Sequence, residues 1–175
     1  MNLILIGQKS SGKTTIGKKL AKKLNLDFID TDILIEDFFL KKYKIRKNCR
    51  EIYKILNFQK FRELESSIIK NISCKNTVIA TGGGIIENLK NLENLKKIGT
   101  IIYLKTDFQQ ILERIKLYKN FPANISENDF EKKFKTIFQN RDFLFNSFSP
   151  KISIYTKNKT VEKIVDEILT KINIL

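Results

Sequence analysis

Five short runs of aliphatic residues recur along the chain, and longer segments of helical period separate them. The runs are rich in Ile, Leu and Val and are too short for helices, so each one predicts a strand. The first run is apolar at every position, which is typical of a central strand covered on both faces. The expected strands are Leu3–Ile6, Phe28–Asp30, Thr77–Ala80, Thr100–Leu104 and Ile152–Tyr155.

The intervening segments place apolar residues three or four positions apart, the spacing of one helical face. Asp107 is expected to cap one of these helices. The stretch 118–128 holds Pro122 and has no sustained period, which predicts a surface loop long enough to move. Strands and helices alternate without a repeat or linker, so we expect a single α/β domain, residues 1–175, with a five-stranded parallel sheet in a three-layer α/β/α arrangement. The other helices are expected over about residues 13–24, 33–39, 50–72, 88–97, 129–145 and 161–172.

Composition excludes several kinds of chemistry. Of the 175 residues, 42% are hydrophobic and 30% charged, the balance of a globular protein with a core. The absence of histidine excludes Ser-His-Asp hydrolysis, histidine-ligated metals and imidazole proton relays. Cys49 and Cys74 lack a CxxC spacing and are expected to be ordinary thiols in a reducing, cytoplasmic setting. No apolar run approaches the length needed to span a membrane, so we expect no membrane partner.

The formal net charge is +14, from 33 basic and 19 acidic residues. The lysines are spread along the whole chain instead of forming one arm or stripe. This distribution favours a generally basic surface that attracts phosphate-bearing small substrates, and we expect no nucleic-acid partner. Binding of nucleic acid through that surface is an alternative.

A phosphate-binding loop follows the first predicted strand directly. The sequence Gly7-x-x-x-x-Gly12-Lys13-Thr14 lies between a buried strand and an amphipathic helix, so a glycine-rich turn that merely contains a lysine is disfavoured. The glycines let successive backbone N–H groups point at phosphates. Lys13 is placed to supply charge at the outer phosphates and Thr14 to coordinate magnesium. Nucleotide contacts are expected at Ser10, Ser11, Gly12, Lys13, Thr14 and Thr15.

Two carboxylates follow the second predicted strand, at the sheet edge where open α/β proteins bind ligands. Asp30 is placed to hold magnesium through water, and Asp32 to accept a proton from a substrate hydroxyl. Alternatively, one or both cap the following helix.

Two further segments are candidates for acceptor binding. Gly82, Gly83 and Gly84 follow the third strand and permit close approach by a ligand; a tight turn is the alternative. Arg62 lies on a helix between the second and third strands, and its planar guanidinium suits a carboxylate or phosphate. An exposed ion pair with Glu63 or Glu65 is the alternative for Arg62.

These motifs together resemble the shikimate kinase family, which phosphorylates the 3-hydroxyl of shikimate with ATP. The resemblance implies a P-loop kinase fold with a mobile lid at about 114–128, an acceptor-binding helical region at about 32–62, Mg2+ as cofactor, and a monomer. The residues 141–145 are similar to the family's Arg-x-x-Leu-Tyr segment. The other matching segments are 7–14, 30–32, 61–62 and 80–84.

The resemblance also implies roles for individual residues. Lys13 and Asp32 would be catalytic, and Thr14 and Asp30 would serve magnesium. Arg114 would approach the nucleotide from the start of the lid. Shikimate would contact Asp32 through its hydroxyls, the two arginines through its carboxylate, and the glycine turn; these residues are Asp32, Arg62, Gly82, Gly83, Gly84 and Arg141.

The lid departs from the family pattern. Family members usually carry Arg-Pro-Leu-Leu, whereas this chain has Phe121-Pro122-Ala123-Asn124. Phenylalanine cannot neutralise charge on a transferred phosphoryl group, so Lys116 or Lys119 is a candidate to compensate. The loss of this arginine leaves an ATP-binding pseudokinase weakened at Phe121 as one alternative. A related kinase with a gluconate-like acceptor is another, because the carboxylate-binding arginines would suit either acceptor. A smaller departure, Asn57-Phe58 in place of Gly-Glu, is expected to affect a turn.

Overall fold

A five-stranded, entirely parallel sheet forms the centre of the molecule, in the order β2-β3-β1-β4-β5. The structure is a computed structural model and describes residues 1–122, 125, 130–148 and 150–174. β1 pairs with a strand on each side and is fully buried, as its continuous apolar run predicts. The strands are β1 (Leu3–Ile6), β2 (Asp27–Asp30), β3 (Thr77–Ala80), β4 (Thr100–Lys105) and β5 (Ile152–Tyr155).

Helices connect the strands in the pattern that parallel pairing requires. In the described part of the chain, no helix has the combination of length and apolarity needed to cross a membrane. The helices are α1 (Lys13–Leu24), α2 (Thr31–Tyr43), α3 (Cys49–Lys70), α4 (Leu89–Ile98), α5 (Phe108–Leu117), α6 (Phe130–Phe148) and α7 (Val161–Ile172), with a 3-10 turn η1 (Ile85–Glu87).

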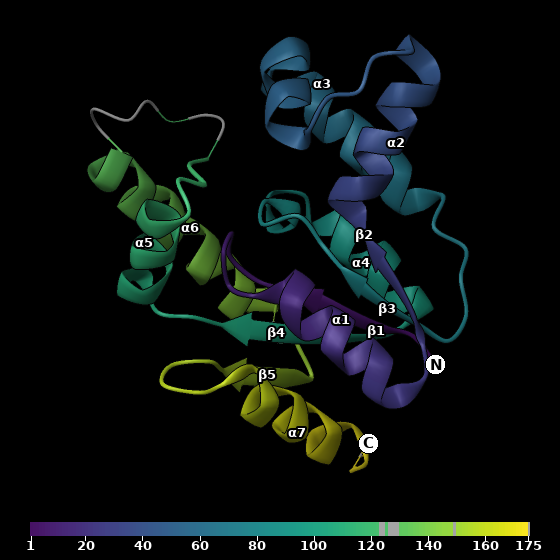
Figure 1. The fold of residues 1–175 in the computed structure, drawn as a ribbon, viewed down its shortest axis with the longest axis vertical. Coiled ribbons are helices and arrows are strands. Elements are labelled where there is room, and N and C mark those ends of the chain that lie inside the picture. Colours follow the sequence, from purple (N-terminus) through teal and green to yellow (C-terminus); the bar gives the residue numbers. More distant parts are fainter. Residues whose placement is uncertain (123–124, 126–129, 149, 175) are drawn as a thin grey trace.

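Alternate residues of β1 contact opposite layers of helices. Leu3 and Leu5 pack with α1 and α7, whereas Ile4 and Ile6 pack with α3, α4 and α6. Figure 1 shows α1 and α7 together on one face of the sheet. The expected three-layer α/β/α architecture is therefore confirmed.

Two smaller hydrophobic clusters lie outside the main core. One joins α2 to α3 through Ile35, Phe39 and Ile52. The other joins α5 to α6 and includes Ile125 and Phe134. Figure 1 shows the pair α2 and α3 and the pair α5 and α6 on opposite sides of the molecule. The loop that joins β1 to α1 lies between the two pairs.

The observed bounds of most elements lie within a few residues of the predicted bounds. β1, β3, β5, α1 and α7 match, whereas α2 extends beyond the expected 33–39 at both ends. The helix expected over 50–72 is interrupted at Asn57, whose φ of 64° and ψ of 176° make a kink where a turn was expected. Residues 123–124 and 126–128 of the expected lid, and the expected helix start at 129, lie outside the described residues.

The capping role expected for Asp107 is wrong in one respect. Asp107 occupies the N-cap position of α5, but its side chain makes no capping hydrogen bond. Its carboxylate accepts a hydrogen bond from Tyr155 Oη at 2.6 Å and pairs with Lys157 Nζ at 2.8 Å. The ion pair with Lys157, which follows β5, thus takes the place of a hydrogen bond from the backbone N–H groups of α5 to Asp107.

Gly99 is a fold position where substitution should be costly. Its φ of −176° suits any residue, but a Cβ there would lie 2.6 Å from the Asn2 carbonyl oxygen. Asn2 in turn bonds Cys74, Thr77 and Ile98, so it cannot move freely. We therefore expect Gly99→Ala to lower the free energy of unfolding by about 2 kcal/mol, measured by urea denaturation. Lys97→Ala, at an exposed position of α4, is the control and should change little; equal stability of Gly99→Ala and the parent would contradict the packing described.

Candidate active site

The loop between β1 and α1 presents backbone donors at the carboxyl edge of the sheet. Ser10 and Gly12 adopt left-handed φ values of 60° and 94°, and Ser11 N donates to Gln8 O at 3.2 Å. Gly12 gives α1 no side-chain cap, and the first turn of α1 has no acidic residue. The first N–H groups of α1 are thus left for an anion, which the helix dipole also favours.

Lys13 is held inside this loop. Its Nζ donates to Gly7 O at 3.0 Å and to Gln8 O at 2.7 Å, and the residue is only 7% exposed. Burial lowers the pKa of Lys13 to about 8, although Asp32 and Asp30 oppose that shift. A phosphate next to this amine would restore its charged form.

Thr14 and Asp30 meet where magnesium would bind. Thr14 Oγ1 donates to Asp30 Oδ2 at 2.7 Å, while Asp30 Oδ1 accepts from the backbone N of Asp32 at 3.0 Å. Asp30 therefore caps α2, as the alternative interpretation held, and also contacts Thr14. Hydroxyl and carboxylate oxygens fit Mg2+, which also takes phosphate oxygens and water. No group of three or more acidic or thiol side chains that could hold a metal occurs in the described ranges.

Asp32 lies in the first turn of α2, against the glycine turn. A Cβ at Gly82 would be 2.9 Å from Asp32 Oδ1, so the glycine makes room for the carboxylate. Burial raises the pKa of Asp32, and the nearby Asp30 adds to the shift, whereas Lys13 and Lys9 lower it. This environment makes Asp32 a stronger base than an exposed aspartate.

The same glycine turn supports Arg62. A Cβ at Gly84 would be 2.1 Å from Arg62 Nη2, so the guanidinium lies directly on the turn. The ion pair considered as the alternative for Arg62 is present, with Arg62 Nη1 and Glu65 Oε2 2.8 Å apart. It is not exposed, however, because the two side chains are only 16% and 2% accessible.

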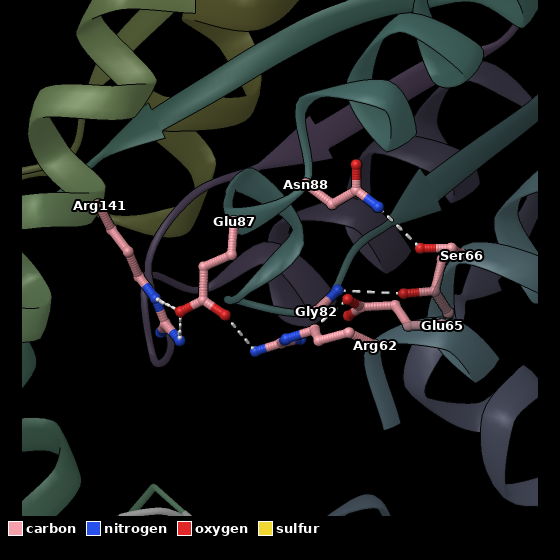
Figure 2. Close-up of polar contacts among 8 residues, drawn as sticks. Arg62, Glu65, Ser66, Gly82, Glu87, Asn88 and Arg141 are labelled. Carbon is pink, nitrogen blue, oxygen red and sulfur yellow. Dashed lines mark hydrogen bonds and ion pairs between the residues drawn. The ribbon is translucent and has the colours of Figure 1, made fainter. Parts of the chain in front are cut away.

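Glu87 bridges the two arginines, as Figure 2 shows. Its Oε2 lies 2.7 Å from Arg62 Nη2, and its Oε1 accepts from Arg141 Nε and Nη2 at 2.9 and 2.6 Å. Arg62 comes from α3 and Arg141 from α6, so Glu87, at the end of η1, holds two distant elements together. The two guanidiniums are thereby fixed on either side of the Glu87 carboxylate.

Every residue expected to bind nucleotide, metal or acceptor lines one cavity of about 600 Å3. Arg114 of α5 donates to Ser10 O at 3.1 Å and ties the start of the lid to the loop. Phe121 also lines the cavity and packs edge-on against Phe130, with ring centroids 4.8 Å apart. Lys116 instead pairs with Glu131 at the surface, and neither it nor Lys119 is among the lining residues.

Several residues of this cavity and its wall are not predicted by the sequence motifs. Lys9, Arg50 and Tyr53 line the cavity, and Glu87 holds the arginines. The position of Glu87 three residues after the glycine turn was a possible signal for its role. Lys9 occupies one of the four positions of the phosphate-binding loop at which the motif accepts any residue, so the motif gave no reason to select it.

A phosphate-binding loop after the central strand of a parallel sheet, with an acidic pair and an arginine pair around one cavity, defines a P-loop small-molecule kinase. The sequence model of the shikimate kinase family matches residues 9–173. The chain belongs to the shikimate kinase family.

Individual relatives agree with this assignment. A shikimate kinase of Bacillus mycoides (strain KBAB4) is 36% identical, with 98% of each chain covered. One from Clostridium botulinum (strain Loch Maree / Type A3) is 38% identical, over 91% of this chain and 85% of the relative.

Solved structures show the same similarity. Shikimate kinase from Acinetobacter baumannii in complex with shikimate has a TM-score of 0.85 and 31% identity, covering 98% of this chain and 92% of that one. A gluconokinase from Sinorhizobium meliloti 1021 has a TM-score of 0.57 and 14% identity, covering 98% and 91%, which is a likeness of fold alone.

Burial of Lys13 should cost stability in the absence of nucleotide. The Lys13 amine binds its proton less tightly in the folded state, where its pKa is about 8, than in the unfolded state, where its pKa is 10.5. At pH 7, below both values, the amine is protonated in both states, so the full free-energy cost of burying its charge lowers the stability of the fold. Lys13→Met should raise the melting temperature of the ligand-free protein at pH 7 by about 4 °C, and the gain should shrink as pH rises above 8. Lys22→Met, exposed on the same helix, is the control; a melting temperature for Lys13→Met below that of the parent would refute this.

Proposed function

We propose that this chain transfers the γ-phosphoryl group of ATP to the 3-hydroxyl of shikimate, giving shikimate 3-phosphate and ADP. The observation that carries the proposal is the single cavity in which Lys13, Asp32 and the arginine pair meet. Membership of the shikimate kinase family supports the same acceptor. The likeness to gluconokinase is one of fold alone, so a gluconate-like acceptor is not favoured.

The nucleotide binds along the loop and the start of α1. Backbone N–H groups of residues 10–15 and the Lys13 amine contact the phosphates, and Arg114 closes over the loop. Thr14 and Asp30 would hold Mg2+, which the 2.7 Å contact between their side-chain oxygens supports. The magnesium ion supplies neutralisation of phosphate charge when it is bound.

The acceptor binds between the glycine turn and the arginines. Arg62 and Arg141 receive its carboxylate, because Glu87 holds both guanidiniums in place while each keeps unused N–H groups. Asp32 accepts a hydrogen bond from the reacting hydroxyl and takes its proton. The hydroxyl oxygen forms the new bond to phosphorus as the bond to the bridging β,γ-oxygen breaks, and ADP leaves with that electron pair.

Residues 1–175 act in this proposal as one domain, with the acceptor region at 32–62 and the lid at 114–128. The cavity-lining position of Phe121 and the bond from Arg114 to Ser10 support a lid that excludes water from the phosphoryl group. The two free thiols, Cys49 and Cys74, support action in a reducing cytoplasm, and we propose that the protein works there as a monomer.

A coupled ADP-release assay with ATP and magnesium tests the acceptor. We expect turnover that depends on shikimate, with kcat/KM for gluconate at least about a hundredfold lower, since Asp32 and the arginines must be satisfied together. Lys13→Met should be inactive and thereby controls for a contaminating ATPase. Preference for gluconate, or no turnover with shikimate, would overturn the proposal.

The proton-accepting role of Asp32 has its own test. Asp32→Asn keeps the size of the side chain but removes the base, so kcat should fall by about 10²- to 10³-fold. ADP affinity, measured by calorimetry, should change little. Asp37→Asn, exposed on the same helix, should retain parental turnover; unchanged kcat in Asp32→Asn would exclude the role.

A further inference from the structure

The side chains of two cavity cations have no partner among the described residues. Lys9 and Arg50 both line the cavity, and within the described ranges neither side chain makes a hydrogen bond or ion pair. In the same ranges, the Nε atom of Arg50 is buried without an acceptor. They differ in this from Arg62 and Arg141, whose guanidiniums are paired with carboxylates of the chain.

Both side chains originate close to Asp32. Lys9 lies against the glycine turn, since a Cβ at Gly83 would be 2.6 Å from Lys9 N. Arg50 follows Cys49, whose Sγ donates to Asp32 O at 3.2 Å. The glycine turn and the start of α3 therefore bring the two cations into the neighbourhood of Asp32 and of each other.

This arrangement is electrostatically unfavourable without a ligand. Arg50 lies in the first turn of α3, where the helix dipole disfavours positive charge. Burial lowers the pKa of Lys9, and the nearby Arg50 lowers it further, while Asp32 opposes the shift. Asp32 offsets only part of this cost, because the net shift of the Lys9 pKa is still downward. The two half-buried like charges would therefore be stabilised by an anion that binds between them.

We propose that Lys9 and Arg50 form an anion-binding subsite beside Asp32, which holds the phosphoryl group as it reaches the acceptor and then the phosphate ester of the product. This inference rests on the proposed function. The loop residues 10–15 account for the phosphates that stay on ADP, and the bridged arginines account for the acceptor carboxylate. The phosphoryl group in transfer is the remaining anion, and it must lie next to the hydroxyl that Asp32 contacts.

The subsite also supplies positive charge that Phe121 cannot supply. Phe121 brings an apolar ring to the cavity, and the lysines nearest it in sequence, Lys116 and Lys119, do not line it. Arg50 offers a planar fork of donors and Lys9 a compact charge, the two kinds of group that bind phosphate best. Lys9 and Arg50 thus add positive charge to the cavity that Lys13 also lines.

Inorganic phosphate tests the subsite without relying on shikimate. With the nucleotide site saturated by ADP and Mg2+, phosphate binding is measured by calorimetry for the parent and for the double variant Lys9→Met/Arg50→Met. We expect the double variant to lose at least about tenfold in phosphate affinity, with ADP affinity unchanged as the check of folding. Lys54→Met, which removes an exposed charge from the same helix, should bind phosphate like the parent.

The charge-conserving variant Lys9→Arg/Arg50→Lys separates charge from packing and should retain phosphate binding. Parental phosphate affinity in the methionine double variant, or equal loss in Lys54→Met or in the charge-conserving variant, would overturn the subsite. A second arm compares ligands: affinity for shikimate 3-phosphate should fall at least about tenfold in the methionine variant while affinity for shikimate changes less than about twofold. If the parent does not use shikimate at all, the proposed function fails, and the phosphate arm still decides on the subsite.

Discussion

Positive charge held away from water around one cavity is the constraint on which the rest of the structure depends. Lys13 is buried, and Arg62 and Arg141 are largely buried. The carboxylates that face these three cations also make contacts with other groups. Buried charges cost free energy unless they are paired and hydrogen-bonded. The chain pairs Arg62 and Arg141 with its own carboxylates and, among the described residues, leaves the Lys9 and Arg50 side chains without such partners. In the proposed account, this division assigns the acceptor carboxylate to the paired arginines and the phosphoryl group to the unpaired cations.

The fold provides the rigid frame that this division needs. β1 is buried on both faces and delivers the loop to the centre of the sheet edge. The glycine turn after β3 has no side chains, so Asp32 and the Arg62 guanidinium can lie against its backbone. Glu87 then joins α3 to α6 across the cavity wall. A small change at the turn would therefore displace the proton acceptor and the carboxylate site together.

The sequence predicted the parts of the site that local patterns encode. The strands followed from apolar runs, and the loop residues 7–14 followed from a spacing that has one physical use. Glu87 could not be assigned a role, because its contact with Arg141 joins positions 54 residues apart and depends on how α6 packs. Asp107 was misjudged for the same reason, since its partners on the β5 side are remote in sequence. Lys9 and Arg50 could be singled out only from the structure, in which their side chains have no ion-pair partner among the residues it describes.

A crystal structure of the protein with ADP, Mg2+ and shikimate 3-phosphate would test this division of charge most directly. The ligand carboxylate should lie on Arg62 and Arg141 with Glu87 still bridging them, and the phosphate ester should lie between Lys9 and Arg50 beside Asp32. A carboxylate bound away from the two arginines, or a phosphate ester that contacts neither Lys9 nor Arg50, would contradict it.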